Sequence, residues 1–444
     1  METLAVALAT RAGGPLRGRV KPPGDKSISH RALILGLLCV GETAIAGLLE
    51  GGDVLRTAEA CAALGAKMER HGEGRWSVRG CGIGSLLAPR APLDFGNSGT
   101  GMRLMMGVVG GHAITAAFDG DASLRNRPMH RILDPLCLMG AEVLAQSPRG
   151  RCPILLKGTS EPVPIVFSPP VASAQLKSAV LLAGLNSPGR TTVIETAATR
   201  DHTEKMLKYF GASIKIEPFA KHGQKITLEG RTDLRPAPVV VPSDPSSAAF
   251  PLVAATIVPR SDIVIEGMMM NPLRTGLLTT LREMGAIVDI LERRDEDFEE
   301  VADLRVRAAA LKGVDVPAAR APSMIDEYPI LAVAAAFASG ETRMRGLAEL
   351  RVKETDRLRA VADGLREAGV ATQIAGEDLI VEGRSGDVLG GGVAATHFDH
   401  RIAMSFLCLG LASRRPMAID DSSMIATSFP GFQTLMEQLG ARFQ

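Results

Sequence analysis

Residues 358–372, LRAVADGLREAGVAT, carry the pattern that decides the fold of this 444-residue chain. One apolar helix face, spaced i, i+3, i+4, i+7, is formed by Leu358, Val361, Ala362 and Leu365. Gly369 fits the position just past a helix, where the backbone turns left-handed. The segment therefore predicts an amphipathic helix, a glycine turn and a following strand.

The same turn occurs six times along the chain. The six copies are Gly65-Ala66-Lys67-Met68, Gly140-Ala141-Glu142-Val143, Gly211-Ala212-Ser213-Ile214, Gly285-Ala286-Ile287-Val288, Gly369-Val370-Ala371-Thr372 and Gly440-Ala441-Arg442-Phe443. Successive glycines are 75, 71, 74, 84 and 71 residues apart. Six copies at nearly constant spacing predict a repeated supersecondary unit.

Each repeat also contains an earlier helix that is apolar nearly all round. Such helices are buried, and their starts are rich in residues that cap helix N-termini. We expect the six starts near Ser27, Ser98, Ser173, Ser246, Asp326 and Asp399. Short strands are expected to follow four of them, at 43–46, 191–195, 262–266 and 342–345. Each unit thus contains a buried helix and an amphipathic helix, with strands between and after them.

The repeats predict an α/β protein of two lobes with three units each. Pro22-Pro23-Gly24 and Val241-Pro242-Ser243 are the best positions for the chain to cross between lobes. This places 1–22 and 243–444 in a first lobe and 23–242 in a second lobe, with a hinge at the two crossings. The charged run 292–303 is interpreted as a solvated loop, and 386–392, GDVLGGG, as a flexible connector that no strand precedes.

Composition excludes several classes of protein. Hydrophobic residues make up 46% and the net charge is +1, so neither a disordered chain nor a coat for nucleic acid or membrane is expected. Apolar runs of about ten residues are too short to span a bilayer, and METLAVALATRAGG has no export-signal pattern. The six cysteines form no CxxC pair and are interpreted as small buried hydrophobes in a reducing cytoplasm.

Basic residues nevertheless gather at the starts of the buried helices and in the polar loops. They are Lys26, Arg31, Arg103, Arg125, Arg127, Lys177, Arg200, Lys205, Arg274, Lys353, Arg357, Arg359 and Arg401. If the units are equivalent, these cations could converge on a cleft that binds a small, multiply anionic ligand. Scattered surface charge is the alternative for any single one of them.

Two carboxylates stand beside these cations. Asp326 opens an apolar helix and could be a plain N-cap. Glu354, between Lys353 and Arg357, could be a helix-surface ion pair. Either could instead be a general acid or base among fixed cations. Metal and nucleotide motifs are missing, and His397 and His400 lack a third ligand, so neither metal nor cofactor is expected.

Five segments carry a resemblance to a known family. They are Gly24-Asp25-Lys26-Ser27-Ile28-Ser29-His30-Arg31-Ala32, Gly96-Asn97-Ser98-Gly99-Thr100, Leu124-Arg125-Asn126-Arg127-Pro128-Met129, Arg351-Val352-Lys353-Glu354-Thr355-Asp356-Arg357 and Asp399-His400-Arg401-Ile402-Ala403-Met404. At these residues the chain resembles the 5-enolpyruvylshikimate-3-phosphate (EPSP) synthases. The resemblance implies a two-domain inside-out α/β barrel of six βαβαββ units, three per domain, with a double crossover.

The resemblance also implies the reaction. The enolpyruvyl group of phosphoenolpyruvate would pass to the 5-hydroxyl of shikimate 3-phosphate, with loss of phosphate, on the route to chorismate and the aromatic amino acids. Addition and elimination through a tetrahedral intermediate need a proton donor, a base and the exclusion of water. Closure over the first substrate would complete the second site.

Matching positions imply three sets of site residues. The catalytic set is Glu354 as proton shuttle and Asp326 as base, with Lys26. Shikimate 3-phosphate would contact Lys26, Ser27, Arg31, Ser173, Ala174, Gln175, Arg200, Asp326 and Lys353. Phosphoenolpyruvate would contact Lys26, Asn97, Gly99, Thr100, Arg127, Gln175, Glu354, Arg357, His400 and Arg401.

Some positions indicate the second, bacterial branch of the family. Ala174, Arg200 and Thr427 replace a Ser, a Tyr and a Lys of the better-known branch. Some members of the second branch tolerate glyphosate and carry Ala where this chain has Gly99, so we expect sensitivity to that inhibitor. A cytoplasmic monomer without nucleic-acid or membrane partners is expected.

Two other functions remain as alternatives. One is the related enolpyruvyl transferase that acts on UDP-N-acetylglucosamine. Its loop matching 119–131 usually carries a reactive Cys, which is missing here, and Lys26-Ser27 replaces its Lys-Asn. The other is a repeat scaffold that binds anionic partners without catalysis. A scaffold would not account for Glu354 and Asp326 beside the cations.

Overall fold

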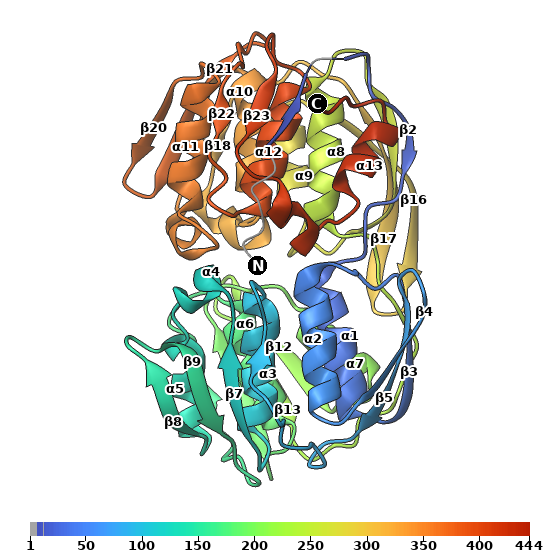
Figure 1. Cartoon of the computed structure of the whole chain (residues 1–444), viewed down its shortest axis with the longest axis vertical. Coiled ribbons are helices and arrows are strands. Elements are labelled where there is room, and N and C mark those ends of the chain that lie inside the picture. Colours follow the sequence, from blue (N-terminus) through green and yellow to red (C-terminus); the bar gives the residue numbers. More distant parts are fainter. Residues whose placement is uncertain (1–6, 12) are drawn as a thin grey trace. The chain divides into compact units, whose positions relative to one another are not determined.

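The computed structural model describes residues 7–11 and 13–444 and divides the chain into two compact lobes (Figure 1). Of the described residues, the first lobe comprises 7–11, 13–25 and 242–444, and the second comprises 26–241. The boundaries expected from the sequence, after 22 and after 242, lie three residues and one residue away. Residues 1–6, part of the segment for which no export signal is expected, lie outside the described residues.

The second lobe contains three units of the same kind. The first is β14 (Val239–Val240), α1 (Lys26–Leu38), β3 (Val40–Ala46), α2 (Gly52–Ala63), β4 (Lys67–Gly72) and β5 (Arg75–Cys81). The second is β6 (Leu93–Asp94), α3 (Gly99–Gly110), β7 (Thr115–Asp119), α4 (Ala122–Arg125), α5 (His130–Leu138), β8 (Glu142–Ser147) and β9 (Arg151–Lys157). The third is β10 (Val166–Phe167), α6 (Ala174–Gly184), β11 (Arg190–Glu195), α7 (His202–Tyr209), β12 (Ile214–Phe219) and β13 (Gly223–Glu229).

The first lobe repeats this pattern three times. Its first unit is β2 (Arg17–Val20), α8 (Pro245–Ile257), β15 (Asp262–Met269), α9 (Gly276–Glu283), β16 (Ile287–Glu296) and β17 (Glu299–Arg307). The next is β18 (Asp315–Val316), η1 (Ala318–Ser323), α10 (Tyr328–Phe337), β19 (Ser339–Met344), η2 (Ala348–Val352), α11 (Arg357–Glu367), β20 (Thr372–Ala375) and β21 (Asp378–Arg384). The last is β22 (Val393–Ala394), α12 (His400–Gly410), β23 (Met417–Ile419), η3 (Ser423–Thr427), α13 (Phe432–Gln438) and β1 (Leu8–Thr10).

Five of the six sheets have four strands in one order, and the sixth, β22-β23-β1, has three. In the second unit of the second lobe the order is β6-β7-β9-β8, with the short first strand parallel to the next and the other pairs antiparallel. The last unit is completed by β1, which pairs with β23 and bridges to Phe443 through Thr10. The expected βαβαββ repeat is confirmed, and the strand β1 pairs with β23 of the last unit.

Two short strands each come, in the chain, directly before a helix of the other lobe. β2 precedes α1 in the chain but pairs with β15 of the first lobe, whereas β14 precedes α8 but pairs with β3 of the second lobe. The chain therefore crosses twice, and the two crossings are bonded to each other. Asp25 N donates to Pro242 O at 2.8 Å and Asp244 N donates to Pro23 O at 2.9 Å.

A buried ion cluster fixes the two crossings at their first-lobe ends. Arg274 donates from Nη1 to Asp25 Oδ2 at 2.7 Å and from Nη2 to Asp244 Oδ1 at 2.9 Å. Burial and the neighbouring Asp25 raise the pKa of Asp244 to about 6. Arg274 therefore serves the crossover rather than a ligand.

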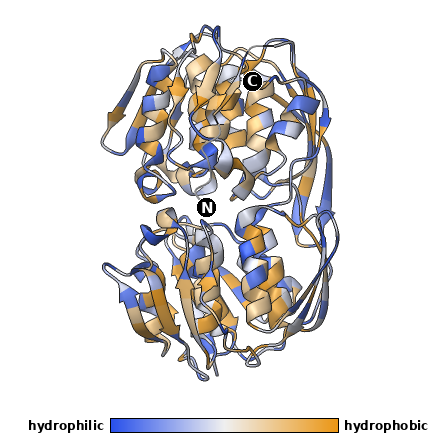
Figure 2. Ribbon diagram, in the orientation of Figure 1, coloured by the Kyte–Doolittle hydropathy of each residue, from blue (hydrophilic) through white to orange (hydrophobic). Residues whose placement is uncertain are grey.

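The six helices inside the lobes are buried because they are apolar on every side. In α8 and α10 every residue is buried, and Figure 2 shows the hydrophobic colour running along the helices of each lobe. Their starts match the expectation: Ser98, Ser173, Asp244 and Asp399 accept the cap bonds of α3, α6, α8 and α12. The short N-terminal turns are therefore where polar side chains enter an apolar interior.

The six glycine turns are one structure repeated. All six glycines have a positive φ, between 78° and 114°. In every copy the glycine N–H donates to the residue three earlier, and the next residue donates to the one five earlier, as in Gly211 N to Lys208 O and Ala212 N to Leu207 O. This pair of backbone hydrogen bonds is the Schellman motif, and it ends each amphipathic helix.

We expect Gly211→Ala to lower the free energy of unfolding by about 1–2 kcal/mol, because a Cβ is strained at φ 89°. The cost is conformational, since a Cβ there would meet no atom closer than 3.8 Å. Gly110→Ala, at the end of α3 with ordinary contacts at 3.4 Å, is the control and should lose no stability. Urea unfolding of both variants tests this; equal stabilities would contradict the role of the turn.

Three expectations from the sequence are wrong. Residues 292–303 form a hairpin of β16 and β17 rather than a solvated loop, because Val301 and Ala302 are buried while charged residues pair across the outer face, as Arg294 does with Asp303. Segment 386–392 is preceded by a strand, β21, which ends at Arg384, so the expectation that no strand precedes it is wrong, although the segment itself forms no helix or strand. Cys137, on α5, is exposed.

In the part of the chain that the structure describes, no helix is long and apolar enough to cross a membrane.

Candidate active-site residues in the two lobes

One group of predicted residues lies at the start of α1 in the second lobe. Lys26 Nζ donates to Asp53 Oδ2 at 3.0 Å, with both side chains mostly covered. Arg31 is buried, and donates from Nε to Thr203 Oγ1 at 2.7 Å and from Nη2 to Ser178 Oγ at 2.9 Å. These bonds fix the Arg31 guanidinium against α6 and α7, one helical turn below Ser27.

A second group joins the starts of α3 and α6. Gln175 donates to Thr100 Oγ1 at 2.8 Å and accepts from Arg103 Nη1 at 2.7 Å. Arg127 is buried and donates to the Asn97 side chain, whose amide nitrogen in turn donates to Asp121 Oδ2 at 2.8 Å. The bonds orient two amides, a hydroxyl and two guanidinium groups around one corner of the lobe.

Gly99 lies in the same corner, and the two guanidinium groups occupy the space that a side chain at residue 99 would need. A Cβ there would lie 2.9 Å from Arg127 Nη1 and 3.2 Å from Arg103 Nη1. Ser173, the cap of α6, accepts from Leu176 N at 3.4 Å, and Ala174 follows it. Ser178 Oγ donates to Ala174 O at 2.6 Å, which connects this helix start to the Arg31 group.

In the first lobe, Arg357 gathers three carboxylates around one guanidinium. It donates from Nε to Asp399 Oδ2 at 2.7 Å and from Nη1 to Asp326 Oδ1 at 3.1 Å, and Nη2 pairs with Glu354. Lys353 Nζ lies 3.6 Å from the same Asp326 oxygen. The structure therefore brings together both predicted catalytic carboxylates with two of their predicted cations.

The Arg357 group is held by opposing electrostatic effects. Arg357 is 1% exposed, and burial opposes its charge, but Asp399, Glu354 and Asp326 outweigh that effect and raise its pKa. Because Asp399 is fully buried, it needs the guanidinium as its counter-charge. Asp326 and Glu354 keep 13% and 16% of their side chains exposed, so both can still be reached by a ligand.

The start of α12 adds a third cation. Asp399 caps this helix by accepting from Arg401 N at 2.9 Å, and Arg401 Nη1 donates to Asp326 O at 3.2 Å. The same Nη1 lies 3.7 Å from Glu327 Oε1. His400 is buried beside it. Helix N-terminus and guanidinium thus present positive charge next to the Arg357 group.

The structure decides the simpler interpretations of the two carboxylates. Asp326 is not the cap of α10, since Glu327 occupies that position and Asp326 binds Arg357 instead. Glu354 precedes α11, and its partner Arg357 is buried, so they do not form a helix-surface ion pair. The sequence marks Asp399 as a helix start and as the first residue of a segment that resembles the family, but it carries no signal for the bond between Asp399 and Arg357.

Several predicted cations do not join these groups. Lys177 is fully buried among carboxylates, and Arg274 serves the crossover. Arg125 and Arg359 form surface pairs with Asp119 and Asp363. Equivalent positions in the repeats therefore do not all carry equivalent roles.

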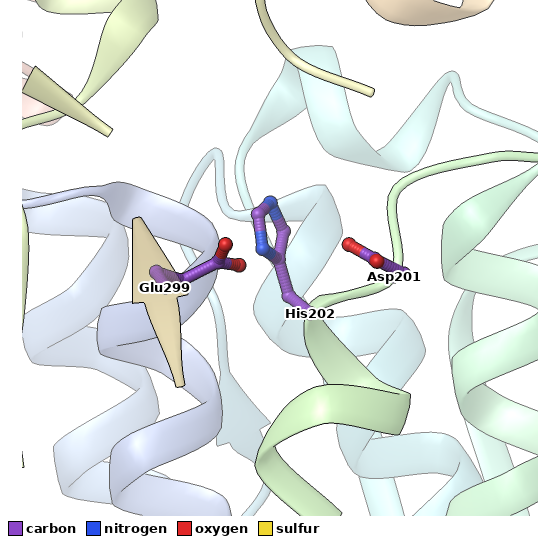
Figure 3. Close-up of side chains that lie close together, drawn as sticks. All are labelled: Asp201, His202 and Glu299. Atoms are coloured by element: carbon purple, nitrogen blue, oxygen red, sulfur yellow. The ribbon is translucent and has the colours of Figure 1, made fainter. Parts of the chain in front are cut away.

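Figure 3 shows Asp201 and His202 at the start of α7, and Glu299 at the start of β17. Within the first lobe, Glu299 accepts from Asn271 Nδ2 at 3.1 Å. His202 is buried in the second lobe. Because the three side chains belong to different lobes, no metal site is assigned to them.

Comparisons with known proteins agree on one family. The family model described as EPSP synthase (3-phosphoshikimate 1-carboxyvinyltransferase) matches residues 10–436. Relatives named 3-phosphoshikimate 1-carboxyvinyltransferase in Methylobacterium sp. (strain 4-46) and Rhodopseudomonas palustris (strain TIE-1) are 65% and 63% identical, each over 98% of both chains. A solved EPSP synthase structure from Acinetobacter baumannii has a TM-score of 0.86 at 39% identity, covering 99% of both chains.

The fold and the three groups of cations fit a two-lobed α/β enzyme that acts on small anionic molecules. The comparisons add the family: the chain belongs to the EPSP synthases. The expectation made from the five segments is thereby confirmed.

Proposed function

We propose that this chain catalyses the reaction of its family, the transfer of the enolpyruvyl group of phosphoenolpyruvate to the 5-hydroxyl of shikimate 3-phosphate. One observation carries the assignment of the chemistry: Arg357 holds Asp326 and Glu354 on one guanidinium, next to Lys353 and Arg401. Two acid–base groups fixed among cations are what addition and elimination on a doubly anionic reagent require.

The proposal assigns to shikimate 3-phosphate the residues that the resemblance implies. Arg31 and Arg200 supply charge-assisted bonds to its anionic groups, since guanidinium donors fit carboxylate and phosphate oxygens. Its other proposed contacts are Lys26, Ser27, Ser173, Ala174, Gln175, Asp326 and Lys353. The bonds that fix Arg31 before any ligand binds reduce the ordering cost of binding.

Phosphoenolpyruvate is assigned to the remaining cations and their neighbours. The proposed contacts are Lys26, Asn97, Gly99, Thr100, Arg127, Gln175, Glu354, Arg357, His400 and Arg401. In the proposed reaction Glu354 gives a proton to the methylene carbon, and Asp326, helped by Lys26, takes the proton of the attacking hydroxyl. The tetrahedral intermediate then loses phosphate, and Glu354 recovers the proton from the methyl group.

Phosphate release tests the proposal and its alternatives. The purified chain should release phosphate when both phosphoenolpyruvate and shikimate 3-phosphate are present, and only background amounts with either one alone. Release with UDP-N-acetylglucosamine in place of shikimate 3-phosphate would indicate the other enolpyruvyl transferase. No release with any pair at micromolar enzyme would favour a binding scaffold and overturn the proposal.

We also propose that this enzyme is sensitive to glyphosate because residue 99 is a glycine. A methyl group at 99 would meet Arg127 Nη1 at 2.9 Å, so Gly99→Ala must displace that guanidinium. We expect Gly99→Ala to weaken glyphosate inhibition by about tenfold or more, corresponding to about 1.4 kcal/mol, and to raise the KM for phosphoenolpyruvate. Inhibition constants of both enzymes check this; an unchanged glyphosate constant would contradict it.

The proposal includes the cellular setting expected from the sequence. All six cysteines are free, which fits a reducing cytoplasm. A monomer that acts on small molecules, without nucleic-acid or membrane partners, needs no extensive basic surface, and the net charge of +1 fits that.

A further inference from the structure

A buried triad of charges joins α6, β11 and α7 in the second lobe. Lys177 Nζ lies 2.9 Å from Glu195 Oε2 and 2.7 Å from Glu204 Oε1. Lys177 and Glu204 are fully buried, and the Glu195 side chain is 2% exposed. A buried ammonium group is costly, so a lysine kept in this position needs an explanation beyond filling space.

The charges of the triad do not balance by themselves. Burial opposes the charge of Lys177, but the two carboxylates outweigh it and raise its pKa. Burial raises the pKa of Glu204 above its ordinary value, and the ion pair with Lys177 opposes that shift. Glu195 also accepts from Gln224 Nε2 at 2.9 Å and from the Thr199 hydroxyl. Lys177 is therefore the charge on which two buried carboxylates depend.

The triad holds the segment that ends in Arg200. Lys177 Nζ donates to Thr199 O at 3.3 Å, the carbonyl directly before Arg200. Glu195 accepts from Thr199 N at 3.5 Å, so both members grip the same residue. Residues 196–200 form no regular element between β11 and α7. Their geometry therefore depends on these side-chain bonds rather than on a helix or strand.

A second set of bonds ties the same helices to Arg31. Ser178, next to Lys177, lies 2.6 Å from Thr203 Oγ1, next to Glu204. Both hydroxyls accept from the Arg31 guanidinium. The triad is thus next in the chain to the two hydroxyls that bind Arg31, and it holds the residue before Arg200; the proposed function assigns both arginines to shikimate 3-phosphate.

We infer that Lys177 is a positioning residue for substrate recognition. Its bond to the Thr199 carbonyl fixes the backbone before Arg200 and thereby orients Arg200 toward the anionic groups of shikimate 3-phosphate. The inference rests on the proposed function. It predicts that loss of Lys177 weakens binding of shikimate 3-phosphate specifically. Arg127, Asn97 and Gly99 are outside the triad, so recognition of phosphoenolpyruvate should be spared.

The test compares two variants, each chosen so that no more than one carboxylate of the triad loses its ion pair. Glu204→Gln alone leaves Lys177 paired with Glu195 and bonded to Thr199. Lys177→Met together with Glu204→Gln removes the lysine without leaving two unpaired carboxylates. Relative to Glu204→Gln, the double variant should raise the KM for shikimate 3-phosphate about tenfold, as expected for loss of a hydrogen bond from a charged group. The KM for phosphoenolpyruvate should stay within about twofold.

A double-mutant cycle separates positioning from general stability. In an Arg200→Ala background, removal of Lys177 should change the shikimate 3-phosphate KM by no more than about twofold, because the group it aims is gone. Lys208→Met changes an exposed lysine on α7, the helix that carries Glu204, and is the control that should change neither KM. Equal effects with and without Arg200, or an unchanged KM in the double variant, would overturn the inference. Failure of the wild-type chain to release phosphate would instead refute the proposed function.

Discussion

Glu354→Gln should lower kcat by about 10²- to 10⁴-fold, the usual contribution of a positioned acid–base group, while shikimate 3-phosphate still binds. Gln keeps the size of the side chain and can accept a bond from Arg357, but it cannot give and recover a proton. The expected loss is therefore in turnover rather than in affinity. Steady-state phosphate release measures kcat, and calorimetry with shikimate 3-phosphate measures binding.

Glu367→Gln is the matched control for this prediction. Glu367 is the last residue of α11 and is exposed, so its neutralisation should leave kcat and the binding constant unchanged. If Glu354→Gln lost binding of shikimate 3-phosphate along with turnover, Glu354 would be a structural residue. If it turned over at the wild-type rate, the proton shuttle would have to be another group.

Arg357→Met should cost about 3–5 kcal/mol of stability as well as activity, because it leaves buried carboxylates without their counter-charge. Asp399 is the main cause, since it is fully buried and takes the 2.7 Å bond from Arg357 Nε. Asp399→Asn in the same chain should recover part of the loss by removing that charge. Urea unfolding at neutral pH, followed for the single and double variants, measures both effects.

Arg359→Met provides the comparison on the same helix. Its side chain is 77% exposed and its pair with Asp363 spans 3.5 Å, so the change should alter stability by no more than about 0.5 kcal/mol. An Arg357→Met protein as stable as Arg359→Met would show that the guanidinium is not the counter-charge of Asp399. Catalytic loss without loss of stability would leave Arg357 as a ligand contact alone.

The regular part of the fold could be predicted because it depends on local chemistry. A helix that ends in a left-handed glycine leaves the same signal wherever it occurs, and Gly65, Gly211 and Gly440 all form the turn that their spacing indicates. Buried helices could also be predicted, because an apolar segment follows a polar capping residue in each, as in α3 and α6. Both features act within a few residues of the chain.

Features that depend on distant partners could not be predicted in the same way. The 292–303 run has the composition of a loop, and it becomes a hairpin because its charges pair across strands, as in Arg294 with Asp303. Likewise, helix starts indicated where cations would gather, but not that Arg274 would be used by the crossover. Partner choice is set by the tertiary fold, which a charge pattern alone does not contain.

The central claim is that this enzyme moves an enolpyruvyl group by breaking the C–O bond of phosphoenolpyruvate. Phosphoenolpyruvate labelled with ¹⁸O at the bridging oxygen, incubated with the enzyme and shikimate 3-phosphate, distinguishes this from cleavage at phosphorus. Elimination from the tetrahedral intermediate sends the bridging oxygen out with phosphate. We therefore expect labelled phosphate and an enolpyruvyl product in equal amounts by mass spectrometry; unlabelled phosphate, with the ¹⁸O kept in pyruvate, would contradict cleavage of the C–O bond.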